Sequence, residues 1–102
     1  MTLTADFLNN NKEFKLVISG AFDFSKVREF RKLVDVPEMK QVEKVTIDLY
    51  NTECIDSSGL GILLALQKDF HIDKQSFEII NANDAIKNIF KMTAFEKVVT
   101  VK

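Results

Sequence analysis

Residues 54–61 read Cys54-Ile55-Asp56-Ser57-Ser58-Gly59-Leu60-Gly61, and this stretch decides how the chain is organised. It follows residues 45–50, in which apolar and polar side chains alternate. A period of two indicates a strand. It precedes a run of apolar side chains with helical spacing that extends to residue 70. We therefore expect a strand, a short polar connection and a helix, in that order.

Asp56, Ser57 and Ser58 lie where the strand ends and the helix begins. Small oxygen-bearing side chains are favoured there, because they accept hydrogen bonds from the first amides of a helix. Capping explains the aspartate and one serine, but it leaves a second hydroxyl without a role. It also leaves Gly59 and Gly61 unexplained, since glycine within a helix costs about 1 kcal/mol relative to alanine. We interpret these small residues as a sign that another group must come close to the backbone at this turn. We take this need as a hint of function.

Length and composition indicate one globular domain over residues 1–102. Hydrophobic residues make up 46% of the chain and charged residues 28%, which is ordinary for a domain that folds on one core. The net charge is −1, and no basic stripe favours nucleic-acid binding. The basic residues within 26–32 are expected to form a solvated helix face.

Membrane insertion and secretion are also disfavoured by the sequence. The longest apolar run, residues 62–66, is far too short to cross a bilayer, and the first residues lack the pattern of a signal peptide. The single cysteine, Cys54, fits a reducing compartment. We expect a cytoplasmic protein in which Cys54 is a small buried residue at a strand end.

The remaining chain alternates strands and helices after an opening hairpin. Strands are expected over residues 2–8, 13–19, 45–50, 77–80 and 97–101, and helices over residues 26–34, 57–70 and 85–91. Ser25 is the expected N-cap of the first helix, which ends before Pro37. This order predicts an α/β fold, a mixed sheet of four to five strands with the helices packed mainly on one face.

The apolar side chains of the central helix do not all fall on one stripe. Four of them share an arc of about 100° that is sufficient to face a core: Ile62, Leu63, Leu66 and Phe70. Leu60 and Leu64 fall outside that arc, on the side of Gln67. Two interpretations stay open, a wide buried face or an apolar patch beside Ser57 that is available to a partner.

Asp56-Ser57-Ser58-Gly59-Leu60-Gly61, after an apolar strand at mid-chain, resembles the STAS domain of bacterial anti-sigma factor antagonists. The similarity extends over nearly the whole chain. Gly20-Ala21-Phe22-Asp23 is similar to the glycine and aspartate that follow the second long strand of the family, with Ala21 where an acidic residue is common. Residues 90–95 resemble the end of the last helix, with Ala94 where glycine is usual. A left-handed helix cap prefers glycine, so Ala94 is a departure from the pattern.

The resemblance implies a function in partner switching. In the family, a partner kinase, often the anti-sigma factor itself, phosphorylates the hydroxyl directly after the aspartate, which is Ser57 here. The unphosphorylated antagonist binds the anti-sigma factor and so releases sigma factor. Phosphorylation releases the partner, and a PP2C-type phosphatase resets the switch. The phosphosite is expected to be supported by four residues: Asp23, Asp56, Ser58 and Gly59.

Further expectations concern the partner surface and the state of the free chain. We expect Leu60, Gly61 and Leu64 to contact the partner. The free chain is expected to be a monomer without a cofactor or a metal site.

The sigma cycle has two alternatives. As an enzyme, Ser57 needs a base within hydrogen-bond reach, and the only histidine, His71, follows the far end of the helix, about 20 Å away. The sequence therefore favours a binding protein over an enzyme. The second alternative is a STAS module that regulates another signalling enzyme, such as a histidine kinase or a cyclic-dinucleotide enzyme. The sequence leaves that alternative open.

Overall fold

The computed structural model describes residues 3–102, in which five strands form one sheet. The strands are β1 (Leu3–Leu8), β2 (Glu13–Phe22), β3 (Lys44–Ile55), β4 (Phe77–Ile80) and β5 (Thr100–Val101), in that spatial order. The helices are α1 (Val27–Val34), α2 (Ser57–Asp69) and α3 (Asp84–Met92), with short 3-10 turns η1 (Phe24–Lys26), η2 (Pro37–Gln41), η3 (Lys74–Ser76) and η4 (Phe95–Lys97) between elements. β1 pairs antiparallel with β2, and all other neighbouring strands are parallel. The expected mixed α/β sheet is confirmed.

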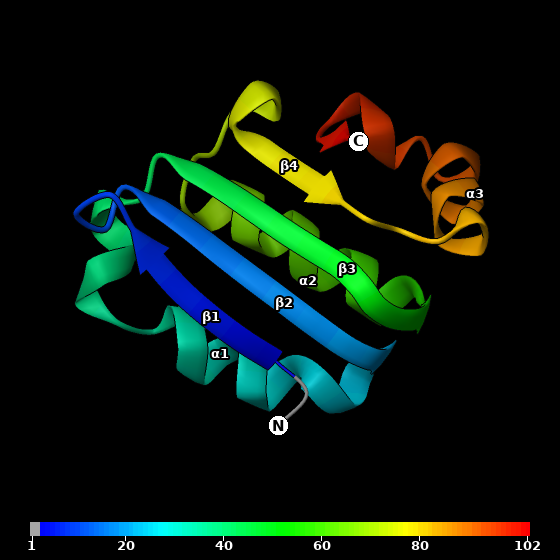
Figure 1. Ribbon diagram of the computed structural model, residues 1–102, viewed down its shortest axis with the longest axis horizontal. Helices are drawn as coiled ribbons and strands as arrows, with labels where there is room; N and C mark the ends of the chain where they lie inside the picture. Colours follow the sequence, from blue (N-terminus) through cyan, green and yellow to red (C-terminus); the bar gives the residue numbers. More distant parts are fainter. Residues whose placement is uncertain (1–2) are drawn as a thin grey trace.

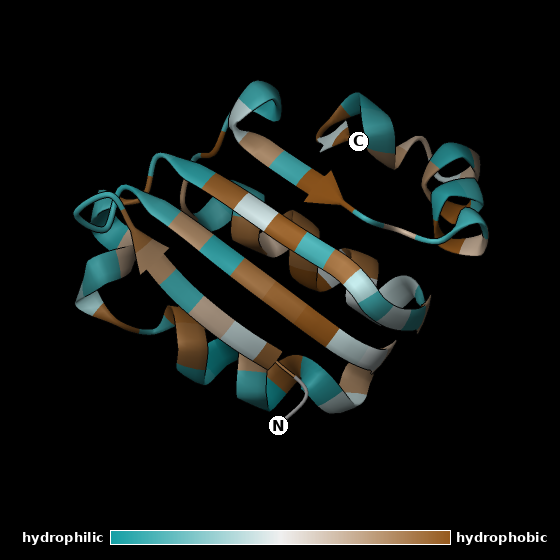
Figure 2. Ribbon diagram, in the orientation of Figure 1, coloured by the Kyte–Doolittle hydropathy of each residue, from teal (hydrophilic) through white to brown (hydrophobic). Residues whose placement is uncertain are grey.

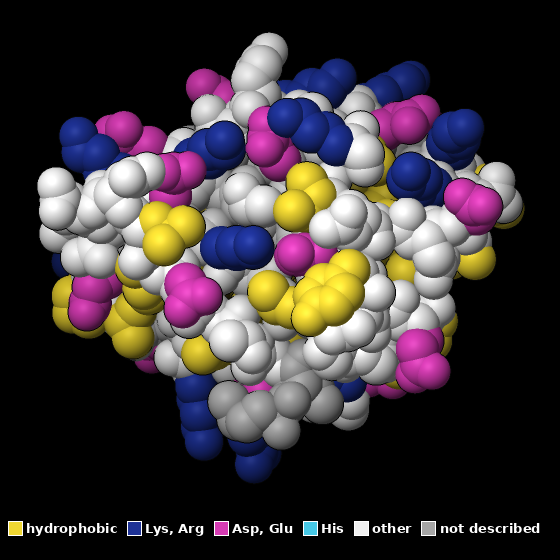
Figure 3. Space-filling model, in the orientation of Figure 1, with side chains coloured by type: hydrophobic (Ala, Val, Ile, Leu, Met, Phe, Trp, Pro, Cys, Tyr) yellow, Lys and Arg dark blue, Asp and Glu magenta, His cyan; other side chains and the backbone are white. Residues whose placement is uncertain are grey.

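The helices cover mainly one face of the sheet, as expected. Figure 1 shows α1 and α2 behind the strands. On β2, Phe14, Leu16 and Ile18 are buried, whereas Lys15 and Val17 between them are only partly buried, because successive strand residues point to opposite faces. Figure 2 shows hydrophobic segments concentrated on β2, β3 and α2. Figure 3 shows the face without helices, where charged, polar and hydrophobic side chains are mixed.

The two central strands run further than the alternation of the sequence predicts. β2 continues to Phe22 and β3 to Ile55, and two register shifts keep them paired. At the first shift, Leu49 and Tyr50 of β3 together lie opposite Ile18 of β2. Such a bulge ends the period of two without ending the strand. The expected ends of these strands, near residues 19 and 50, were therefore wrong.

The N-cap of the first helix differs from the expected one. Ser25 does not cap α1, because residues 24–26 already form the turn η1 ahead of it. The cap of that turn is Asp23, whose Oδ1 accepts hydrogen bonds from the Ser25 amide at 2.9 Å and from the Ser25 hydroxyl at 2.6 Å. The acceptor is thus two residues earlier than the sequence pattern indicates.

Ala94 has the left-handed backbone for which the resemblance predicts glycine. Its φ of 57° and ψ of 24° are left-handed, a conformation that costs a non-glycine residue roughly 1–2 kcal/mol. α3 is therefore followed by a left-handed residue, at a cost in free energy that glycine does not carry.

Candidate functional site

The candidate site lies where the carboxyl ends of β2 and β3 meet. Phe22 and Ile55 are paired at this edge of the sheet, and the Asp56 amide donates a hydrogen bond to the Phe22 carbonyl at 3.4 Å. Asp23 directly follows Phe22, just as Asp56 follows Ile55. Each aspartate caps the helical segment after it, Asp23 the turn η1 and Asp56 the helix α2. The two carboxylates therefore lie at the ends of adjacent strands.

Ser57 has no capping role in this arrangement. The Asp56 carboxylate accepts the hydrogen bond from the Gly59 amide at 3.0 Å and is therefore the side-chain cap of α2. Ser57 is the first residue of α2 and is exposed, while Ser58 is partly buried. Within residues 3–102, no hydrogen bond engages the Ser57 hydroxyl. The hydroxyl is thus free, at the positive end of a helix dipole.

The two glycines of the motif have different roles. A Cβ on Gly59 would overlap the carbonyl oxygen of Phe22 and lie 2.8 Å from Cγ1 of Ile55. The close approach expected at this turn is therefore made by α2 against the sheet. A Cβ on Gly61 would meet no atom within 4 Å, and Gly61 is exposed. Only Gly59 is required by internal packing.

Leu60 and Leu64 match neither interpretation of the central helix completely, because they are neither fully buried nor fully exposed. Both side chains are partly buried and pack against the core. Gln67, on the same side of α2, donates a hydrogen bond from Nε2 to the Val98 carbonyl. This side of the helix therefore faces the C-terminal segment, and only part of each leucine is open beside Ser57.

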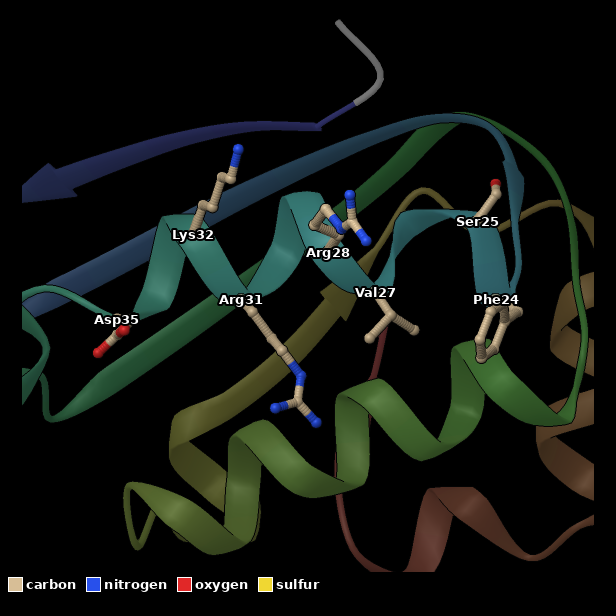
Figure 4. Close-up of a pocket in the computed structure, with 7 residues that line it drawn as sticks. All are labelled: Phe24, Ser25, Val27, Arg28, Arg31, Lys32 and Asp35. Carbon is tan, nitrogen blue, oxygen red and sulfur yellow. The ribbon is translucent and has the colours of Figure 1, made fainter.

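Phe24 is a feature of the site that the sequence analysis missed. Its side chain is 75% exposed, although it follows Asp23 directly in the turn η1. The turn η1 contacts α2, and Figure 4 shows the Phe24 ring over the first turn of that helix. A single aromatic residue between two polar ones is the only signal in the sequence. That signal does not distinguish an exposed ring from a buried one.

Asp23 is held in its ionised form. The hydrogen bond from the Ser25 hydroxyl is the main cause that lowers the pKa of Asp23, and the Ser25 amide and the charge of Lys26 lower it further. The Lys26 side chain is buried, and its Nζ donates a hydrogen bond to the Ala21 carbonyl at 2.6 Å. The negative charge of Asp23 is therefore present next to the start of α2 at neutral pH.

Ser25→Ala is expected to raise the pKa of Asp23 toward its ordinary value, because it removes the main hydrogen bond that stabilises the carboxylate. Since the pKa of Asp23 is lowered in the folded state, its contribution to stability is present above the ordinary pKa. It is lost as the pH falls through the lowered value. NMR titration of the Asp23 carboxyl in both proteins measures the shift. An unchanged pKa in Ser25→Ala would show that the amide and Lys26 suffice.

The structure also bears on the expectations for Cys54, metal ligands and membrane spans. Cys54 is exposed, so the expectation of a buried thiol was wrong. It fails because β3 continues past residue 50 and its two register shifts leave Ile55 facing the core, so the neighbouring Cys54 points to the other face. Within residues 3–102, no group of three or more metal-binding side chains is close enough to hold an ion. No helix of that range is both long and apolar enough to cross a membrane.

The comparison with known families decides the identity of the fold. The family model described as "Mlab, STAS domain" matches residues 7–100. The chain belongs to the STAS-domain family. This confirms the resemblance to the STAS domain of anti-sigma factor antagonists.

Similar proteins and solved structures agree with this assignment. The STAS domain is 27% identical over 97 residues to a STAS-domain containing protein of Pseudomonas aeruginosa (strain UCBPP-PA14), covering 95% of each chain. It is 21% identical over 101 residues to the anti-sigma-B factor antagonist of Staphylococcus aureus, covering 99% of this chain and 94% of that one.

Two solved structures show the same fold. An anti-sigma factor antagonist from Mycobacterium paratuberculosis superposes with a TM-score of 0.74 at 19% identity, covering 97% of this chain and 84% of that one. The phosphorylated form of SpoIIAA, a Bacillus cell fate determinant, superposes with a TM-score of 0.71 at 14% identity, covering 98% and 90%. At these identities the structures establish the shared fold.

Proposed function

We propose that this STAS domain is an anti-sigma factor antagonist controlled by phosphorylation of Ser57. Unphosphorylated, it binds an anti-sigma factor that is also a serine kinase, and sigma factor is released. Phosphorylation of Ser57 by that kinase ends the complex, and a PP2C-type phosphatase restores the binding form. The observation that carries the proposal concerns the start of α2. Asp56 is the side-chain cap there, and the Ser57 hydroxyl is exposed and makes no hydrogen bond to any described residue.

The position of Ser57 explains how a phosphate can act on binding without disrupting the fold. A phosphate adds roughly −1.5 to −2 charges at pH 7. At a helix N-terminus such a charge is favourable by about 0.3–1 kcal/mol. In an interface beside Asp23 and Asp56, however, an unpaired buried charge costs about 2–5 kcal/mol. The nearby cation, Lys26, is already bonded to the Ala21 carbonyl.

The geometry around Ser57 favours a role in binding over a role in catalysis. A nucleophilic serine needs a base within hydrogen-bond reach. The only histidine of the chain, His71, lies beyond the opposite end of α2, whose 13 residues span about 20 Å. We therefore propose a binding protein that acts as a monomer in the cytoplasm.

Phosphate mapping tests the proposal. Ser57→Ala, which remains in the binding form, serves as bait to isolate the kinase from the native host. The kinase is then incubated with the wild-type chain and ATP, and peptide mass spectrometry is expected to place the phosphate on Ser57. Ser57→Ala should remain unlabelled. A phosphate on Ser58 or Thr52 contradicts the assignment, and a histidine kinase or a cyclic-dinucleotide enzyme on the bait contradicts the sigma cycle.

Leucine truncations are expected to separate partner binding from stability. Leu66 is fully buried, and Leu66→Ala should cost about 2–5 kcal/mol of unfolding free energy. Leu64 is partly buried, so Leu64→Ala should cost less stability and weaken partner binding by about tenfold or more. Urea titration and calorimetry measure the two effects. If Leu64→Ala destabilises the domain as much as Leu66→Ala, Leu64 belongs to the core and not to the partner surface.

A further inference from the structure

A groove of about 350 Å³ separates α1 from α2 on the helix side of the molecule. Small side chains of α2, Ser58, Gly61 and Ala65, form one wall. They recur at spacings of three and four residues, which places them on one side of the helix. Because these side chains are short, they leave a hollow along α1 that larger residues would fill. The other lining residues are Val27, Phe30, Arg31, Val34, Ile62 and Asp69.

A second hollow of about 520 Å³ continues the groove over the outer side of α1. The two hollows share Val27 and Arg31. Figure 4 shows the guanidinium of Arg31 extending toward α2 while the Lys32 side chain points away from it. Phe24, with its exposed ring, lies at the end nearest the start of α2, and Asp35 lies at the other end. Together the hollows form one continuous surface, here called the α1–α2 surface.

Positive charge dominates the middle of the α1–α2 surface. Arg28, Arg31 and Lys32 line it, and none of them takes part in an ion pair found within residues 3–102. The carboxylates that line the two hollows lie at the far end: Asp35, which directly follows α1, and Asp69 on α2.

The carboxylate of α1, Glu29, accepts a hydrogen bond from the Leu3 amide at 3.1 Å, and it lines a separate hollow beside Arg28 and Lys32 on the side of α1 toward β1. Along the α1–α2 surface, therefore, the exposed ring of Phe24 lies at the end near Ser57, beside the Asp23 carboxylate, the middle is cationic and the far end is acidic. A complementary ligand places an apolar group against Phe24 at the end near Ser57, and carboxylates against the cationic middle of the surface.

We propose that the α1–α2 surface binds an acidic amphipathic helix of the partner, and that this helix ends beside Ser57. The proposal rests on the proposed function and names the chemistry of the partner segment. An amphipathic helix places its apolar side chains in a hydrophobic groove at intervals of three and four residues. Phe24, Val27 and the small wall of α2 provide that groove. Arg28, Arg31 and Lys32 select acidic flanks by charge complementarity.

The same arrangement explains how phosphorylation opposes binding beyond the immediate site. A phosphate on Ser57 places negative charge at one end of a surface that binds a negatively charged segment. Repulsion between exposed groups acts over about 10 Å at 0.1 M salt. The added charge therefore acts on the partner helix as well as on the contacts of Ser57 itself.

A pair of designed peptides tests the inference directly. Both are helices of roughly 18 residues with the same leucines at intervals of three and four. One carries glutamates on its flanks and the other lysines at the same positions. Each is titrated into the full chain labelled with 15N, at about 50 mM salt to limit screening. The glutamate peptide is expected to bind about tenfold tighter or more, and to shift amide signals of residues 24–35 and 58–69.

Charge-reversal variants provide the control. The double variant Arg28→Glu/Arg31→Glu should reverse the preference, so that the lysine peptide binds tighter. Lys87→Glu, an exposed change on α3, should leave the preference intact. Equal affinities for the two peptides, no binding of the glutamate peptide at about 1 mM, or shifts confined to the edge of β1 or the open face of the sheet would overturn the inference.

Failure of the inference and failure of the proposed function are distinguishable, because the peptide titration requires neither kinase nor phosphatase. If the glutamate peptide binds as expected while no kinase phosphorylates Ser57, the α1–α2 surface stands and the phosphorylation switch fails. If Ser57 is phosphorylated but the two peptides bind equally, the switch stands and the acidic helix is rejected.

Discussion

Gly59→Ala is expected to destabilise the domain by about 1–3 kcal/mol or more. The new methyl group would overlap the Phe22 carbonyl and crowd Ile55. The Phe22 carbonyl is a backbone group that accepts the hydrogen bond of the Asp56 amide. This carbonyl cannot move away without disturbing the junction of β2 with β3. Any shift that removes the overlap therefore costs free energy.

Gly61→Ala is the matched control, two residues away in the same helix. A Cβ there meets no atom within 4 Å, and alanine is favoured over glycine in a helix by about 0.5–1 kcal/mol. Urea titration should therefore show opposite signs for the two variants. Similar stabilities would show that the packing of α2 against the end of β2 is looser than the structure indicates.

The second large effect concerns the charge of Ser57. Ser57→Asp is expected to keep the melting temperature of the wild type within a few degrees, because its carboxylate lies at the positive end of α2. Its affinity for the partner is expected to fall by about 2 kcal/mol or more, which corresponds to a factor of about 30. Ser57→Ala should bind as the unphosphorylated wild type does. Calorimetry with the isolated partner measures all three proteins.

Gln75→Asp adds the same charge at an exposed position of η3. It should leave both stability and affinity unchanged. A loss of affinity in this variant would attribute the effect to net charge and not to the site. An unfolded Ser57→Asp protein would instead make Ser57 a structural residue.

Most of the fold was predictable from local patterns, because its elements carry strong periodicities. The hairpin, the three helices and β4 lie close to where the sequence indicates them. The errors arise where tertiary pairing overrides the pattern. At the bulge opposite Ile18, β3 continues although its alternation ends. A second shift follows before Cys54, which lies next to the buried Ile55 and points to the other face. The sequence pattern does not show how many such shifts a strand contains.

The candidate site was predictable in its chemistry but not in its packing. The motif of Asp56 and Ser57 indicates a cap and a free hydroxyl, and the structure shows which residue makes the cap. That Gly59 touches the end of β2 depends on how α2 crosses the sheet. The exposure of Phe24 depends on the turn η1, which starts earlier than the expected cap. The first depends on a contact between segments distant in the sequence, and the second on a local turn whose cap is Asp23 and not Ser25.

The proposed switch is tested most directly by the affinity of the partner for the phosphorylated chain. The wild-type domain, fully phosphorylated on Ser57, is compared by calorimetry with the same preparation after phosphatase treatment. We expect the phosphorylated form to bind the partner at least about thirtyfold more weakly, and phosphatase treatment to restore the affinity completely. Equal affinity of the two forms would contradict the control of partner binding by Ser57.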